Sequence, residues 1–77
     1  MDSYIERYIR DLNEEGIEFT YSNDILTDVV YLKLIDRRNG VKAIRTTDYW
    51  RFKDSLNLTF IIREMVNELL NKRTALI

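Results

Sequence analysis

Residues 28–36 read Asp-Val-Val-Tyr-Leu-Lys-Leu-Ile-Asp, and this stretch decides the class of the fold. Its β-branched, aromatic and long apolar side chains favour an extended strand. On its N-terminal side, residues 17–21 alternate between apolar and polar side chains, which indicates another strand, and residues 22–24 (Ser-Asn-Asp) are typical of a turn. On its C-terminal side, the run from Val41 to Thr47 indicates a third strand. The sequence therefore predicts an antiparallel meander of three strands.

The connection that follows residue 36 predicts how the second and third strands pair. A three-residue loop at 38–40 (Arg-Asn-Gly), with its glycine in the left-handed conformation, is a common hairpin connection. This loop places Leu34 opposite Ile44 and Asp36 opposite Lys42, so that apolar side chains meet and opposite charges meet. Both faces of the resulting hairpin are substantially apolar, whereas one layer of helices can cover only one of them. The uncovered face is a reason to expect a partner.

Helical patterns flank the meander on both sides. Apolar residues recur at helical spacing within residues 4–15, and Gly16 follows at the position where a helix commonly ends. The C-terminal pattern is regular from about Leu56 to Lys72 and can begin as early as Asp48. The sequence thus predicts an α+β fold, a single small domain over residues 1–77 with the order α-β-β-β-α, a three-stranded antiparallel meander and two helices packed on one face.

The composition argues against an enzyme. The chain has no histidine and no cysteine, so it lacks the nucleophile–base pairs of common hydrolases and the usual ligands of zinc, copper or iron. Its two glycines are isolated, so no phosphate-binding loop is present. We therefore predict a protein without catalytic residues, cofactor or metal. Because no apolar run is long enough to span a membrane and the N-terminus has no signal-peptide pattern, we expect a cytoplasmic protein that does not bind membranes.

Charge is distributed unevenly along the chain. Residues 1–36 carry nine acids and three bases, and residues 37–77 carry nine bases and four acids, so the two parts have net charges of −6 and +5. Such asymmetry indicates a charged partner or complementary self-association. The acidic residues of the first helix and its loop are a candidate surface for a basic partner protein, although an ordinary solvated helix face is the alternative. They are Asp2, Glu6, Asp11, Glu14, Glu15 and Glu18.

A basic stretch with interleaved aromatic residues is the second candidate, because bases bind phosphates and aromatic rings stack on unpaired nucleobases. Its residues are Arg37, Arg38, Lys42, Arg45, Trp50, Arg51 and Lys53. The order α-β-β-β-α also resembles that of double-stranded RNA-binding domains, which implies the same class of ligand. However, the loop at 22–27 lacks the Gly-Pro-x-His motif of that family, and residues 51–54 replace its lysine cluster. The alternative is that Trp50 and Phe52 fill a corner of the core.

Surplus apolar surface is the third feature. The stripe of the last helix covers close to half of its circumference, more than the ~100° that one sheet face needs. The residues predicted for self-association are Phe60, Ile61, Met65, Leu69 and Leu76. Together these patterns predict a non-enzymatic protein-interaction module, a small regulator or inhibitor that forms a homodimer and binds a partner protein through a charged surface. Nucleic-acid binding through the basic hairpin is the alternative function.

Overall fold

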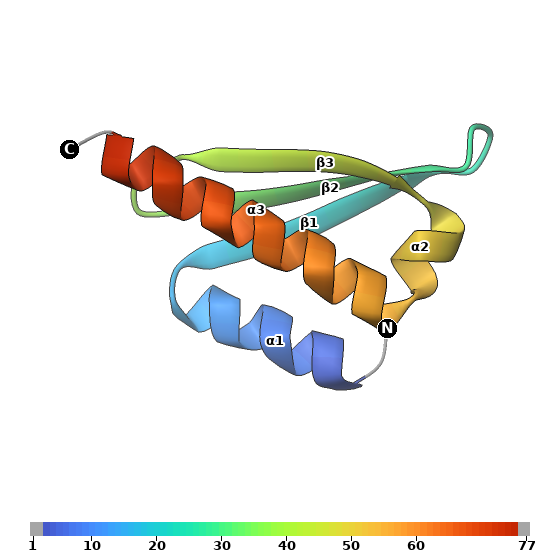
Figure 1. Ribbon diagram of the computed structural model, residues 1–77, viewed down its shortest axis with the longest axis horizontal. Helices are drawn as coiled ribbons and strands as arrows, with labels where there is room; N and C mark the ends of the chain where they lie inside the picture. Colours follow the sequence, from blue (N-terminus) through green and yellow to red (C-terminus); the bar gives the residue numbers. More distant parts are fainter. Residues whose placement is uncertain (1–2, 76–77) are drawn as a thin grey trace.

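The computed structural model describes the backbone of residues 3–75 and the side chains of residues 3–72. Three strands form one antiparallel sheet in the order β1-β2-β3, with two helices on one face and a short helix at one end (Figure 1). The predicted α+β fold class is confirmed. The elements are α1 (Ser3–Glu14), β1 (Ile17–Asp24), β2 (Val29–Asp36), β3 (Lys42–Asp48), α2 (Tyr49–Lys53) and α3 (Ser55–Ala75).

Two aspartates divide the C-terminal helical segment into α2 and α3. The Asp48 carboxylate accepts a hydrogen bond from the backbone N–H of Arg51 at 2.7 Å and thereby starts α2. Asp54 then leaves the helical conformation, and its Oδ1 accepts from the backbone N–H of Leu56 at 3.0 Å. Short polar side chains favour the position before a helix because they satisfy its free N–H groups. The chain therefore changes direction at Asp54, and α3 runs back along the sheet.

The turn between β1 and β2 lies later in the chain than predicted. Residues 22–24 continue β1, and the turn is formed by residues 25–28. The Asp24 Oδ1 accepts from the backbone N–H of Leu26 at 3.1 Å, and Asp28 adopts a φ of 58°. Aspartate tolerates this left-handed conformation better than most residues. The pairing is consequently continuous over eight residues, from Ile17 opposite Asp36 to Asp24 opposite Val29.

The predicted register of the β2–β3 hairpin is wrong by one residue. The loop has four residues, 37–40, and the backbone N–H of Asp36 donates to the Val41 carbonyl at 2.8 Å. Gly40 does have the predicted positive φ, at 73°. Leu34 lies opposite Ala43 rather than Ile44. Since side chains alternate between faces, this shift moves Ile44 to the uncovered face of the sheet, where it is exposed.

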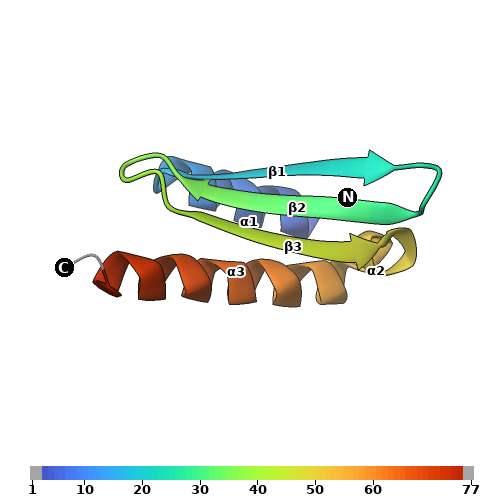
Figure 2. The ribbon, with the colours of Figure 1, turned by 90° about the horizontal axis from the view of Figure 1, so that it is seen from above.

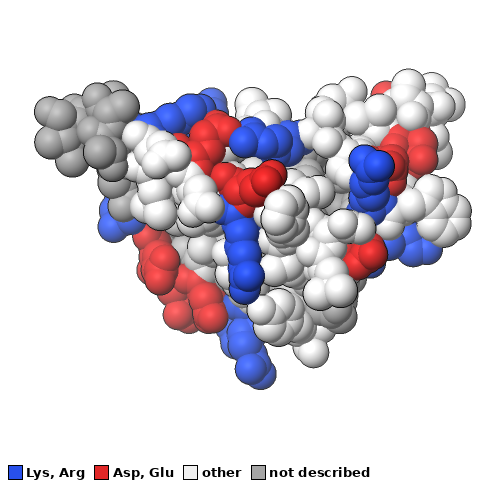
Figure 3. Space-filling model, in the orientation of Figure 1, with Lys and Arg blue, Asp and Glu red and all other residues white. Residues whose placement is uncertain are grey.

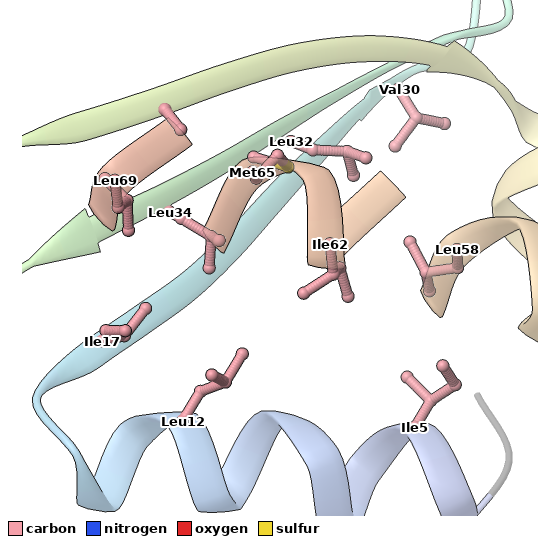
Figure 4. Packing of buried hydrophobic residues seen from close by; sticks show 11 residues of the cluster. Ile5, Leu12, Ile17, Val30, Leu32, Leu34, Leu58, Ile62, Met65 and Leu69 are labelled. Atoms are coloured by element: carbon pink, nitrogen blue, oxygen red, sulfur yellow. The ribbon is translucent and has the colours of Figure 1, made fainter. Parts of the chain in front are cut away.

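The core lies between the sheet and the two long helices. Ile5 and Leu12 of α1 point into this space (Figure 4). Met65 of α3 and Leu32 of β2 belong to the same buried cluster. The buried apolar residues are Ile5, Leu12, Ile17, Val30, Leu32, Leu34, Ala43, Leu58, Ile62, Met65 and Leu69. One face of the sheet and one apolar stripe of α3 are therefore buried in the core.

No helix of residues 3–75 lies over the opposite face of the sheet (Figure 2). This face carries Tyr31 and Ile44, both substantially exposed, and Lys33 lies directly opposite Ile44 in the register. These three residues and parts of β1 surround a shallow hollow of about 280 Å³. Within residues 3–75, no helix combines the length and apolar character needed to cross a bilayer.

Candidate functional site

The most exposed apolar surface of the helix layer surrounds a hollow of about 290 Å³ at the start of α1 and α3. We call it the helix-end hollow; it is lined by Tyr4, Ser55, Leu56, Thr59, Phe60 and Arg63. Asp54 sets the start of α3, so that Leu56 already lies within the helix. Leu56 and Phe60, four residues apart, therefore share one side of it. Tyr4, Leu56 and Phe60 are 58%, 83% and 63% exposed. Three large apolar side chains therefore remain in water around one depression.

The residues predicted for self-association separate into two groups in the structure. Phe60 lies at the helix-end hollow, and Ile61 is half-buried against the core. Met65 and Leu69 are fully buried against the sheet, so these two side chains are not available to a second chain. Leu76 lies outside the described residues. Sequence analysis omitted Tyr4 and Leu56, although the four-residue spacing of Leu56 and Phe60 off the core stripe was a usable signal.

The predicted acidic surface is mixed with basic side chains. Glu6, Asp11, Glu14, Glu15 and Glu18 are all exposed, and Asp2 lies outside the described residues. Arg7 and Arg10 are exposed on the same helix, between the acids. On the face of the molecule shown in Figure 3, basic and acidic side chains alternate and do not form a patch of one sign. The surface of α1 therefore carries charges of both signs and does not produce a strong negative field.

Five of the seven residues predicted to bind nucleic acid lie at opposite ends of the sheet. Arg37 belongs to the β2–β3 loop, and its Nη2 donates to the carbonyl of Asn13 at the end of α1, at 2.7 Å. Arg38, in the same loop, is paired with the buried Asp36. Trp50, Arg51 and Lys53 belong to α2 beyond the other end of β3. The seven residues of β3 span about 23 Å at ~3.3 Å per residue, so the structure does not bring the two basic groups together.

The aromatic residues of α2 divide between the surface and the core. Trp50 is 74% exposed, so the expectation that it fills a core corner is wrong. The Lys53 Nζ lies 5.1 Å from the centre of the Trp50 ring and 5.2 Å from that of Tyr49, which are cation–π distances. Phe52 is half-buried, and its ring lies 4.8 Å from that of Tyr21. A helix of five residues presents only one side to the sheet, and Phe52 occupies it.

Lys42 and Arg45, the remaining predicted basic residues, take part in a network along β3. Glu68 of α3 forms ion pairs with Arg45 and with Lys72, the latter at 2.8 Å. The Lys72 Nζ also donates to the Lys42 carbonyl at 2.7 Å, and the Arg45 Nη1 donates to the Ile44 carbonyl at 2.8 Å. The side-chain hydrogen bonds from Lys72 and Arg45 lower the pKa of Glu68. The network thus ties α3 to β3.

We expect Glu68→Gln to lower the free energy of unfolding at neutral pH by about 0.2–1 kcal/mol, since partly exposed ion pairs contribute little. A lowered pKa in the folded state means that this stabilisation is present above the ordinary pKa of the carboxyl group and is lost as the pH falls through the folded value. Urea unfolding of both proteins at a series of pH values from neutral into acid would measure the difference, which should shrink as the pH falls through the folded pKa of Glu68. Glu64→Gln, on an exposed residue of the same helix without a recorded ion pair, is the control. Equal effects of the two substitutions at neutral pH would contradict the network.

The described part of the chain contains no group of three or more acidic side chains placed to hold a metal ion. Comparison with protein-family models, with curated proteins and with solved structures finds no match to this chain. The candidate functional surfaces are the helix-end hollow, the uncovered sheet face and the two sheet edges.

Proposed function

We propose that the protein is a non-enzymatic protein-interaction module that forms a homodimer through the helix-end hollow. The exposure of Tyr4, Leu56 and Phe60 around one depression is the observation that carries this proposal. Contiguous apolar surface of this kind marks interfaces in small proteins. A two-fold axis beside the hollow would allow Phe60 of each copy to enter the hollow of the other, and the same residues would serve both sides of the contact.

The strength of such a dimer can be bounded. Fully burying a large apolar side chain contributes about 1.5–3 kcal/mol, and these three side chains expose on average roughly two thirds of their surface. Six of them across a two-fold axis would contribute about 6–12 kcal/mol. Association itself costs about 4–15 kcal/mol in lost rigid-body freedom. The two ranges overlap, so we expect a weak dimer that forms at micromolar or higher concentration.

A small module of this kind would act as a regulator or inhibitor by occupying a surface of a partner protein. This reading is favoured over nucleic-acid binding because the predicted phosphate-binding residues lie at both ends of the sheet and several already have partners within the chain. Arg37 donates to Asn13, Arg38 pairs with Asp36, and Arg45 pairs with Glu68. A strand of nucleic acid would have to displace these contacts or bind through the few remaining basic side chains.

We expect the wild-type protein to show a concentration-dependent mass that approaches twice 9.3 kDa in size-exclusion chromatography with light scattering. Phe60→Glu should remain monomeric, because it would bury a carboxylate at the centre of the contact. Leu26→Glu is the matched control, since Leu26 is 96% exposed in the turn of residues 25–28, away from the hollow, and this variant should still dimerise. A wild-type protein that stays monomeric up to millimolar concentration would refute the dimer, and dimerisation of Phe60→Glu would refute its location.

A further inference from the structure

The two edges of the sheet are treated differently by the rest of the molecule. Along β3, α3 runs beside the strand, and Lys72 and Arg45 bind the carbonyls of Lys42 and Ile44. Along most of β1, no helix or strand in the described part of the chain lies beyond the margin of the sheet (Figure 2). Natural sheets usually protect a long edge, because its free backbone groups can pair with another strand.

The backbone groups that β1 leaves free can be assigned from the pairing. The Asp36 N–H donates to the carbonyl of Val41, the residue directly before β3, so in alternation the backbone groups of Leu34, Leu32 and Val30 point to β3. Those of the intervening β2 residues point to β1, where their partners are Glu18, Thr20, Ser22 and Asp24. The N–H and C=O groups of Phe19, Tyr21 and Asn23 therefore point outward. Within the described residues, no hydrogen bond is recorded on these outward groups.

β1 also lacks the usual means of edge protection. Its eight residues contain no proline, no lysine and no bulge, and the register with β2 is continuous. All residues from Thr20 to Asn23 are exposed. Strand addition, in which an extended segment of another protein pairs with a free edge, requires a strand of this length and regularity.

We propose that β1 is a strand-addition site for an extended segment of a partner protein that carries basic side chains toward the uncovered face and apolar side chains toward the core face. On the uncovered face, Glu18 and Asp24 lie near the two ends of β1, and neither forms a recorded ion pair with a described residue. On the core face, Phe19 is half-buried and Tyr21 half-exposed, and their rings lie 6.1 Å apart. An added strand would meet carboxylates at both ends of one face and aromatic surface on the other.

A second copy of the chain fits this edge less well than a basic partner. Two β1 strands side by side would bring together four carboxylates from Glu18 and Asp24 and no base of their own. Opposite charges directly across a strand pair are stabilising, whereas like charges are destabilising. The inference names a partner class for the proposed interaction function, on which it rests. Its surface is separate from the helix-end hollow, so the two can fail independently.

A synthetic heptapeptide provides the test: acetyl-Lys-Val-Thr-Val-Thr-Val-Lys-amide, with its two Lys residues replaced by Glu in the comparison peptide. Titration into ¹⁵N-labelled protein should shift the amide signals of Phe19, Tyr21 and Asn23 and slow their hydrogen exchange, because these N–H groups gain acceptors. The Glu peptide should bind about 2- to 30-fold more weakly than the Lys peptide, as expected from the loss of two exposed ion pairs. Absence of shifts on β1 with the Lys peptide would overturn the proposal, as would equal binding of both peptides.

Variants of the edge separate strand addition from other binding. Tyr21→Pro removes an outward N–H without removing a hydrogen bond to β2, which edge strands tolerate, and it should bind the Lys peptide far more weakly than Tyr21→Ala. Asn23→Pro against Asn23→Ala repeats this comparison at a side chain without a packing role. Glu18→Lys combined with Asp24→Lys should reverse the preference to the Glu peptide, whereas Glu64→Lys on α3 should leave it unchanged. Phe60→Glu should bind the Lys peptide like the wild type, which distinguishes this site from the dimer. Pairing of β1 with itself, seen as exchange protection without peptide, would overturn the choice of partner.

Discussion

Met65→Ala is expected to lower the free energy of unfolding by about 2–5 kcal/mol, the range found when a large buried apolar side chain is truncated. Met65 is fully buried near the centre of α3, in the same cluster as Leu32 of β2 (Figure 4). The core of so small a domain rarely supplies more than about 3–5 kcal/mol in total. A large fraction of the variant should therefore be unfolded at 25 °C, which urea titration followed by circular dichroism would measure.

Phe60→Ala is the matched comparison on the same helix. Because most of the Phe60 side chain is already in water, its truncation should change the stability of the monomer by no more than about 0.5 kcal/mol. The measurement belongs at concentrations where the protein is monomeric, so that a lost dimer does not contribute. If Phe60→Ala proved more destabilising than Met65→Ala, α3 would have to present the opposite side to the sheet.

Asp36→Ala is expected to lower the free energy of unfolding by about 1–3 kcal/mol, because it removes the acceptor of a partly buried hydrogen bond. The Asp36 side chain is almost completely buried, and its Oδ1 accepts from the backbone N–H of Arg38 at 3.0 Å. The Arg38 Nε lies 3.5 Å from the same oxygen. Without the carboxylate, the backbone N–H of Arg38 in the loop at 37–40 loses its acceptor.

Asp36→Asn tests whether hydrogen bonding or charge is responsible. The amide oxygen of asparagine can still accept from Arg38, so this variant should lose clearly less stability than Asp36→Ala in the same urea titration. If both variants were as stable as the wild type, the loop would be held by its backbone hydrogen bonds alone, such as that from the Gly40 N–H to the Asp36 carbonyl at 2.7 Å.

Asp36 also explains why the hairpin register could not be predicted. The sequence pattern predicted a three-residue loop, in which the Asp36 carboxylate lies opposite Lys42 across the strands. In the structure the carboxylate turns inward and binds the loop backbone, and Asn39 Oδ1 accepts from the Val41 N–H at 2.9 Å. Local bonds from a side chain to nearby backbone groups outweigh an exposed ion pair, and they favour the four-residue loop. Such bonds depend on burial that composition does not reveal.

The surfaces were only partly predictable for a related reason. Periodicity identified the apolar stripe of α3, and the three strands and Gly16, with its φ of 90°, were recognised, although β1 continues through the predicted turn at 22–24. Periodicity does not tell which part of a wide stripe the sheet covers, so Met65 and Leu69 were assigned to a partner although the core contains them. Trp50 was misplaced because its size suggested burial, whereas α2 directs Phe52 inward. The free edge of β1 follows from strand order and register, which only the fold specifies.

The meander has a kinetic consequence. The strands pair in the order of the sequence, β1 with β2 and β2 with β3, and the connections between them have four to five residues. Short loops close quickly and at low entropic cost, so the sheet can form by successive local steps. The packing of Ile5 in α1 near Leu58 and Ile62 in α3 is different, because it joins segments from opposite ends of the sequence (Figure 4). In folding terms, the docking of α1 against α3 is the step with the largest loop to close, and it can follow a hairpin nucleus instead of preceding it.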